Sequence, residues 1–305
     1  MTTTVTVANR ETNELGEGPF WDPVRQQLLW VVIRRGLVFV GGLEPGGTIE
    51  VRERVSFRGT VGAVAVSAGG EWIVAAAEEV LLRDTGGALR PGPRVLPPDC
   101  GRRLNDGKPD PAGRYLVGSL SLADESSTQE LLAVLDHDGT VRVLDDDLTL
   151  SNGLGWSADG SRMYSIDTLR QTVYVRDYDP LTGSAGPRES FLTVERGYPD
   201  GMCLDTAEHL WIAMWGLGQV HRYSPAGELV AVIDVPAPHV SSVAFAGPGL
   251  DTLVITTATQ DLTDDQLARF PDSGRLFTAA PGVSGVPQVL WSGFLGSPPS
   301  PRTKD

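Results

Sequence analysis

The chain has 305 residues, enough for one large all-β domain or two ordinary domains with a sizeable core. A net charge of −14, from 39 acidic against 25 basic residues, argues against nucleic acid as a partner. No apolar run approaches the roughly 20 residues that span a bilayer, and the N-terminus lacks a secretory pattern, so we expect a cytoplasmic protein without a membrane partner.

Six short apolar segments recur along the chain, each after a turn. Their spacing of roughly 43 to 48 residues is typical of propeller blades or of a solenoid. Most remaining segments have the length, apolar content and Gly, Pro, Asp or Asn borders of short strands. We therefore predict an all-β, six-bladed β-propeller with four-stranded blades. The six segments are residues 28–31, 72–75, 115–118, 163–166, 210–213 and 253–256.

Local signals complete the organisation of the chain. The strongest helical signal covers residues 262–270, where Thr263 can cap a short helix. The tail at 297–305 has three prolines and no large apolar residue, so we expect it to be disordered. No linker interrupts the chain before it, which favours one domain over residues 1–296. Hairpin turns are predicted at Asp138-Gly139, Asp159-Gly160 and Ala226-Gly227.

Four side chains that carry oxygen atoms occur at one position of the repeat, about ten residues before the apolar segment. They are Glu17, Asn105, Asn152 and Asp200. Equivalent positions of a radially repeated fold face one axis, so these residues should form one site. Carboxylate and amide oxygens are the ligands that hard divalent cations prefer, and a cation relieves the repulsion between two carboxylates. The repeat thus points to a central metal site.

The innermost strand of each blade should contain a pair that ends in glycine, because a crowded axis demands close backbone approach. In the third repeat, either Asn105 or Asp106 can occupy the shared position, and the sequence leaves this choice open. Singly, each polar residue beside a glycine is more often a turn former than a ligand. His239 either lines the mouth of the pocket or is a solvated loop histidine. The pairs are Glu17-Gly18, Val61-Gly62, Asp106-Gly107, Asn152-Gly153, Asp200-Gly201 and, without glycine, Ser241-Ser242.

Several motifs together resemble the SMP-30/gluconolactonase/regucalcin family of six-bladed propellers, from about residue 15 to residue 293. Each motif is modest alone, and their shared order and spacing make the resemblance specific. They are LGEGPFWDP at 15–23, RLNDGK at 103–108, DPAGR at 110–114, SNGLGWS at 151–157, YPDGM at 198–202 and GPGLDTL at 247–253.

This resemblance implies a function and roles for the site residues. Glu17, Asn152 and Asp200 look like ligands of one divalent cation, with calcium favoured and magnesium, manganese or zinc as alternatives. Arg103 and Asn105 look like substrate contacts. The implied reaction is lactone hydrolysis, in which the metal polarises the carbonyl and Asp200 activates water. The expected partner is a small-molecule lactone or ester, and the protein should be a monomer or a weak homo-oligomer.

The sequence also departs from the family pattern. Val32 stands where an acid is usual, and Ser121-Leu122-Ala123 stands where some members have a substrate-binding Glu. Residues 34–40 are less polar than a typical sugar-lactonase start, which favours a less polar substrate. Two alternatives therefore stay open. One is a non-hydrolytic enzyme of specialised metabolism that reuses the metal site, and the other is a non-catalytic calcium-binding propeller.

Overall fold

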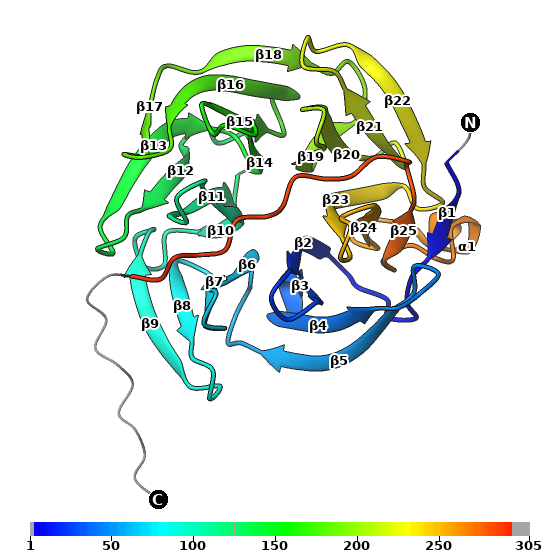
Figure 1. Ribbon diagram of the computed structural model, residues 1–305, viewed down its shortest axis with the longest axis horizontal. Helices are drawn as coiled ribbons and strands as arrows, with labels where there is room; N and C mark the ends of the chain where they lie inside the picture. The colour runs from blue at the N-terminus through cyan, green and yellow to red at the C-terminus, as the bar shows by residue number, and fades with distance from the viewer. Residues whose placement is uncertain (1–2, 125, 295–305) are drawn as a thin grey trace, which may run out of the picture.

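The computed structural model describes residues 3–124 and 126–294, so the predicted disordered tail at 297–305 lies outside the described residues. Within the described part, antiparallel strands form four-stranded blades arranged around an axis, as in a β-propeller (Figure 1). The innermost strands are β2 (Gly16–Asp22), β6 (Ala63–Val66), β10 (Arg102–Pro109), β14 (Ser151–Trp156), β19 (Tyr198–Leu204) and β23 (His239–Ala246).

The second strands contain all of the predicted apolar segments, which confirms the repeat. They are β3 (Gln27–Val32), β7 (Trp72–Ala75), β11 (Tyr115–Ser121), β15 (Arg162–Asp167), β20 (Leu210–Trp215) and β24 (Thr252–Ala258). The third strands are β4 (Leu37–Leu43), β8 (Glu79–Arg83), β12 (Glu130–Leu135), β16 (Thr172–Asp179), β21 (Gln219–Tyr223) and β25 (Phe277–Ala279). The outer strands are β5 (Ile49–Ser56), β9 (Leu89–Arg94), β13 (Val141–Leu148), β18 (Glu189–Thr193), β22 (Leu229–Asp234) and β1 (Val5–Val7).

Hydrogen bonds divide these strands into sheets. β2–β5, β6–β9 and β10–β13 each form a four-stranded sheet, and β14–β16 are extended by β18 and the short β17 (Ser184–Ala185). The remaining strands form an eight-stranded sheet in which β19–β22 meet β23, β24, β25 and β1 through one residue pair, Trp215 with His239. The N-terminal β1 pairs with β25, so the two ends of the fold close on one another.

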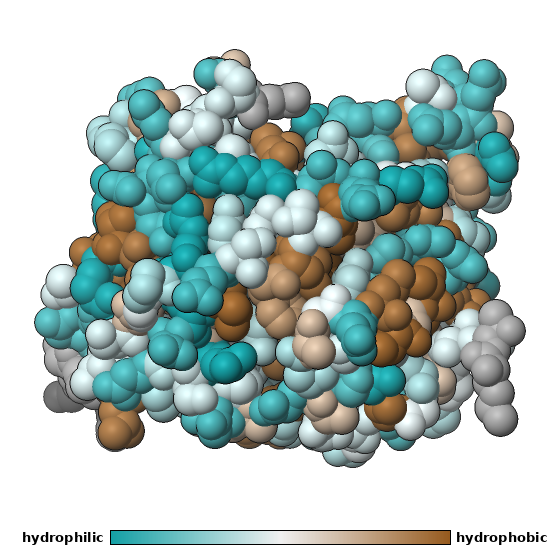
Figure 2. All heavy atoms as spheres, turned by 90° about the horizontal axis from the view of Figure 1, so that it is seen from above, coloured by the Kyte–Doolittle hydropathy of each residue, from teal (hydrophilic) through white to brown (hydrophobic). Residues whose placement is uncertain are grey.

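Burial falls from the axis to the rim. Every residue of β14 is buried, whereas β22 is mostly exposed or half-buried. Inside one blade, Trp30 of β3 stacks on Phe39 of β4 with ring centroids 5.1 Å apart. The edge-on view in Figure 2 shows a flank covered mainly by hydrophilic residues, with separate apolar patches between them. Removal of apolar side chains from water thus holds the inner layers together.

Five of the innermost strands have a register shift at nearly the same place. The shifts fall between Glu17 and Phe20, Leu104 and Gly107, Asn152 and Leu154, Pro199 and Met202, and Val240 and Ser242. An extra residue at such a bulge bends the strand and changes the direction of a side chain. The predicted innermost pairs lie at these shifts, except for the pair at 61–62, which directly precedes β6.

The local signals are also confirmed. The predicted hairpin turns join β12 to β13, β14 to β15 and β21 to β22. The predicted helix is α1 (Asp264–Arg269), which Thr263 caps reciprocally with Gln266. Among the described residues, no helix is long and apolar enough to cross a membrane.

The last described segment, residues 280–294, crosses one face of the propeller (Figure 1). The Trp21 backbone N–H donates to Gln288 Oε1 at 2.6 Å, and Gln288 Nε2 donates to Pro19 O at 3.3 Å. Further along, the Trp291 N–H donates to Val66 O at 2.9 Å. The segment therefore joins the innermost strands of separate sheets.

Gly62 offers a test of the crowding at the axis. A Cβ atom at this position would collide with the Asn105 carbonyl oxygen and lie 2.8 Å from Leu104 O, and both are backbone atoms. We expect Gly62→Ala to lower the free energy of unfolding by about 1–3 kcal/mol in urea titrations, because the strands must separate. Gly86→Ala is the control, since a Cβ atom there would meet a side-chain oxygen of Asp84, at 3.3 Å, rather than backbone atoms. Equal stability of the two variants would contradict the prediction.

Candidate functional site

The four predicted residues lie near the starts of β2, β10, β14 and β19, within or next to the register shifts. Their exposed fractions are 8% for Glu17, 6% for Asn105, 5% for Asn152 and 6% for Asp200. Around the axis, each innermost strand contacts the next, and β23 contacts β2. Polar side chains from separate repeats are thereby buried at one end of the axis.

A chain of hydrogen bonds runs through this end of the axis. Asn105 Nδ2 donates to Asn152 Oδ1 at 2.9 Å and to Ser151 O at 3.0 Å. Asn152 Nδ2 donates to Thr168 Oγ1 at 2.9 Å, and the Thr168 hydroxyl donates to Pro199 O at 2.8 Å. This chain links β10, β14 and β19, and it fixes the amide of Asn152 beside the residue that precedes Asp200.

Glu17 and Asp200 are buried acids with little hydrogen-bond compensation. Glu17 Oε2 accepts one bond, from the Gly18 N–H at 3.0 Å, and Asp200 Oδ1 is buried with no partner among the described residues. Burial, followed by the charge of Asp106, raises the pKa of Glu17 to about 8. Burial and the nearby charge of Glu17 hold the pKa of Asp200 well above its usual range. A cation between the two carboxylates would relieve both penalties.

Glu17, Asn152 and Asp200 fit a divalent cation by their chemistry. Their oxygen atoms suit a hard ion, and the carbonyl of Asn152 has a second lone pair beside the one that Asn105 uses. Within the described ranges, no three His, Cys, Asp or Glu residues come together as a metal site. A cation here therefore depends on the amide oxygen of Asn152 as the third protein ligand.

Arg103 is a buried cation with unused donors. Its Nη1 donates to Leu104 O at 2.9 Å and to Asn105 Oδ1 at 2.7 Å, while Nε and Nη2 have no hydrogen-bond partner in the described part of the chain. Burial lowers its pKa to about 10, and the charges of Glu17 and Asp200 oppose that change. The guanidinium remains protonated at neutral pH and has donors left for a ligand.

Asp106 and Lys108 are charged residues at the axis whose roles sequence reasoning missed. With Gly18, Ser242 and Gln288 they line a cavity of about 10 Å³, enough for one water molecule. Lys108 Nζ donates to Leu154 O at 2.8 Å and to Met202 O at 2.9 Å, so it ties β10 to β14 and β19. The sequence left open whether Asn105 or Asp106 occupies the shared position of the repeat. In the structure Asn105 bonds to Asn152, whereas Asp106 lines the cavity.

His239 is the first residue of β23, at the same end of an innermost strand as Glu17 in β2. Its ring stacks on Trp215 with centroids 4.1 Å apart and an angle of 13° between the planes. Nδ1 lies 2.8 Å from the Gln260 carbonyl oxygen, which can only accept, so Nδ1 carries the proton. Burial lowers the pKa of His239, which leaves Nε2 as a hydrogen-bond acceptor.

The apolar residues that favoured a less polar substrate lie elsewhere. Val38, Phe39 and Val40 are buried in β4, and Val32 packs with Trp30 in the same blade. These side chains fill the core of the first blade, so they say nothing about the polarity of the substrate. That reason for expecting a less polar substrate was wrong.

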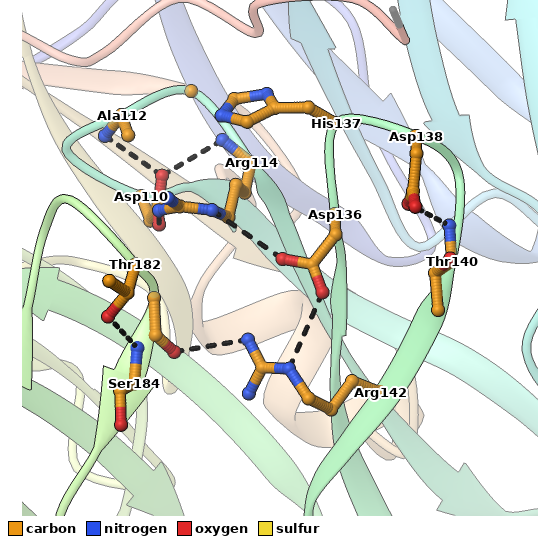
Figure 3. Close-up of polar contacts among 12 residues, drawn as sticks. Asp110, Ala112, Arg114, Asp136, His137, Asp138, Thr140, Arg142, Thr182 and Ser184 are labelled. Carbon is orange, nitrogen blue, oxygen red and sulfur yellow. Dashed lines mark hydrogen bonds and ion pairs between the residues drawn. The ribbon is translucent and has the colours of Figure 1, made fainter.

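The acids of the hairpin at 136–139 have structural partners. Asp136 forms ion pairs with Arg114 at 3.5 Å and with Arg142 at 3.4 Å, and Asp138 accepts from the Thr140 N–H at 2.8 Å (Figure 3). A separate cavity of about 620 Å³ is lined by residues 7–11, 48–51, 54 and 275 and contains none of the predicted site residues. The axial cluster, in contrast, brings together two buried carboxylates, Glu17 and Asp200, that have little hydrogen-bond compensation.

The raised pKa of Glu17 predicts how the metal-free protein responds to pH. Between about 4.5 and 8 the folded state keeps a proton that the unfolded state has released, so stability falls as the pH rises. We expect urea titrations in chelator at pH 5, 6.5 and 8 to show a free energy of unfolding that declines with pH. The slope for one proton is at most about 1.4 kcal/mol per pH unit.

Glu17→Gln should make this decline smaller, because an amide does not titrate. Asp159→Asn should leave the decline unchanged, since hydrogen bonds already hold the pKa of this exposed carboxyl at about 2. The same slope in wild type and in Glu17→Gln would contradict a raised pKa at Glu17.

The chain is similar to a described family and to several known proteins. The chain matches the family described as SMP-30/Gluconolactonase/LRE-like region over residues 15–259. It is 35% identical to pentonolactonase XacC of Haloferax volcanii over 261 residues, 85% of this chain and 86% of that one. It is 31% identical to regucalcin of Danio rerio over 292 residues, 93% and 97% of the two chains.

Among solved structures, the fold is similar to that of regucalcin from Agrobacterium tumefaciens, described as a calcium-binding protein. The TM-score is 0.88 at 28% identity, with 95% of this chain and 98% of that chain covered. The match over residues 15–259 contains Glu17, Arg103, Asn105, Asn152, Asp200 and His239. The chain therefore belongs to the SMP-30/gluconolactonase family.

Proposed function

We propose that this protein is a metal-dependent hydrolase of lactones, with Glu17, Asn152 and Asp200 as the ligands of one divalent cation. The observation that carries the proposal is the buried Oδ1 of Asp200, which has no hydrogen-bond partner among the described residues and lies near the charge of Glu17. Membership of a family that includes a named pentonolactonase supplies the substrate class.

The chemistry that a cation bound there supplies is polarisation of the lactone carbonyl and stabilisation of the charge that develops on its oxygen. Calcium suits the all-oxygen ligand set, and magnesium, manganese or zinc are alternatives. Asp200 acts as the general base that takes a proton from the attacking water. Because a bound cation lowers the basicity of Asp200, its raised metal-free pKa keeps it closer to the range of a useful base.

The other site residues bind and position the substrate. Arg103 has free N–H donors at Nε and Nη2 for substrate oxygens, and Asn105 holds both Arg103 and Asn152 through its side chain. His239 offers Nε2 as an acceptor at the rim, with its ring held by Trp215. The bound ligand is a small-molecule lactone or a related ester.

We further infer that the blades number six and form one domain over residues 1–296. The support is the contact of each innermost strand with the next around the ring, from β2 through β6, β10, β14, β19 and β23 back to β2. The eight-stranded sheet then comprises two blades joined by the pair of Trp215 with His239.

A non-catalytic calcium-binding protein is the second candidate, favoured by the similarity to a solved structure described as calcium-binding. Such a protein needs the oxygen ligands but has no use for a buried arginine with free donors. Arg103 therefore favours the hydrolase. Loss of the usual acid at Val32 keeps a non-hydrolytic reaction at the same site as a further alternative.

Chelation tests the metal requirement. We expect D-glucono-1,5-lactone or another member of a lactone panel to acidify a weakly buffered solution faster with the protein and calcium than without protein. Chelator should remove at least about 90% of this increase, and an excess of divalent cation should restore it. Hydrolysis at the uncatalysed rate across the whole panel would count against the proposed function and favour the calcium-binding alternative.

Asp200 is tested separately. Asp200→Asn should lower kcat about 10²-fold or more, because an amide cannot accept the proton and the general base is lost. Asp159→Asn, an exposed carboxylate in a surface turn, is the matched control and should keep the wild-type kcat. Retained calcium binding in Asp200→Asn, measured by calorimetry, would separate loss of the base from loss of the ion. An unchanged kcat would rule Asp200 out as the base.

A further inference from the structure

A second arginine lies on the same rim as Arg103. Arg34 belongs to the 3-10 helix η1 (Ile33–Arg35), which directly follows β3 at the end of the axis that holds Glu17. The Val61 N–H donates to Ile33 O at 3.2 Å, and the neighbouring Gly62 packs on the backbone of Asn105. The segment at 61–62 therefore separates η1 from the start of β10. Arg34 is also close enough for its charge to lower the pKa of Arg103.

Both guanidinium groups have N–H donors without a hydrogen-bond partner among the described residues. Arg34 Nη1 donates to Glu14 Oε1 at 3.1 Å, with the two side chains 53% and 44% exposed, and its other donors have no partner among the described residues. An exposed ion pair of this kind contributes little to stability, so a ligand anion can replace Glu14 at little cost. Arg103 keeps Nε and Nη2 free, as described above.

The balance of charge favours an anion once a cation is bound. Glu17, Asp106 and Asp200 face the positive charges of Arg34, Arg103 and Lys108, which gives three carboxylates and three cations. With Glu14 included, four carboxylates face three cations. A bound divalent ion favours the ionised forms of Glu17 and Asp200, and these groups together with the ion then carry a total charge of +1. A neutral substrate leaves this positive charge uncompensated.

We propose that the preferred substrates are lactones that bear a second, negatively charged group, a carboxylate, sulfonate or phosphate, which Arg34 and Arg103 bind. This proposal rests on the proposed function and adds the substrate class to it. The charge-assisted hydrogen bonds of two guanidinium groups suit such oxyanions, and arginine can bind them through two parallel donors. The lactone carbonyl remains on the side of Glu17 and Asp200.

The test compares two 1,4-lactones that differ only at C6. The 1,4-lactone of glucaric acid has a C6 carboxylate, and the 1,4-lactone of gluconic acid has a neutral hydroxymethyl group there. For the calcium-loaded wild type we expect kcat/KM to be at least about tenfold higher for the glucarate lactone, the discrimination that one charge-assisted pair provides. Arg34→Ala should lower this ratio about tenfold, and 0.5 M salt should lower it as well.

Arg35→Ala is the matched control, because it removes an exposed arginine from the same turn of η1 and should leave the ratio unchanged. A thermal melt of each variant excludes unfolding. Equal losses for both lactones in Arg34→Ala, or a wild-type ratio near one, would overturn the proposal.

If neither lactone is hydrolysed, the wider lactone panel decides the proposed function, and calorimetric binding of glucarate and gluconate to the calcium-loaded protein tests the anion site independently. Tighter binding of glucarate that Arg34→Ala weakens would support it, and equal binding of the two acids would overturn it.

Discussion

Close approach of the innermost strands is the constraint on which the rest of the structure depends. At Gly62, Gly153 and Gly201 the backbones and side chains of the next strand leave no room for a Cβ atom, and at Gly153 it would lie 2.6 Å from Asp200 O. Five of the innermost strands also shift register against the second strand of their own blade, as at a β-bulge. The shifts also bring Glu17, Asn105 and Asp200 to the end of the axis.

Polar groups gathered there are costly to bury, and most of them are compensated by bonds between strands. Lys108 donates to carbonyl groups of two other strands, and the chain from Asn105 through Asn152 and Thr168 reaches Pro199. The exceptions are Glu17 and Asp200, whose buried carboxylates have too few hydrogen bonds from the described residues to offset the cost of burial. The arrangement that carries this cost is the one on which the proposed cation site rests, and perturbed groups of this kind often occur at functional sites.

Much of this could be predicted because it is local or periodic. The second strands follow from the repeated apolar segments, and the cap of α1 follows from Thr263 and Gln266 within one turn. The roles of Thr168, Lys108 and Gln288 were not predicted. Each acts by bonding to backbone atoms of strands distant in sequence, and a single sequence carries no periodic signal for such contacts. The repeat frame, applied to the second strands as well, would have placed Thr168 at the end of the axis.

The apolar stretch after Arg35 was given a functional meaning that it does not have. Composition alone linked it to the substrate, but β4 buries most of it within a blade, whereas the preceding Arg34 is exposed and pairs with Glu14. The sequence by itself determined the repeat, the all-β class and the four polar residues that share one position of the repeat, since strand periodicity and turn chemistry are local properties. Only the tertiary structure decided that Asn105 rather than Asp106 bonds to Asn152, that Asp200 lacks a partner, and that Arg34 lies near Arg103. Those relations depend on distances between strands that the chain brings together from far apart.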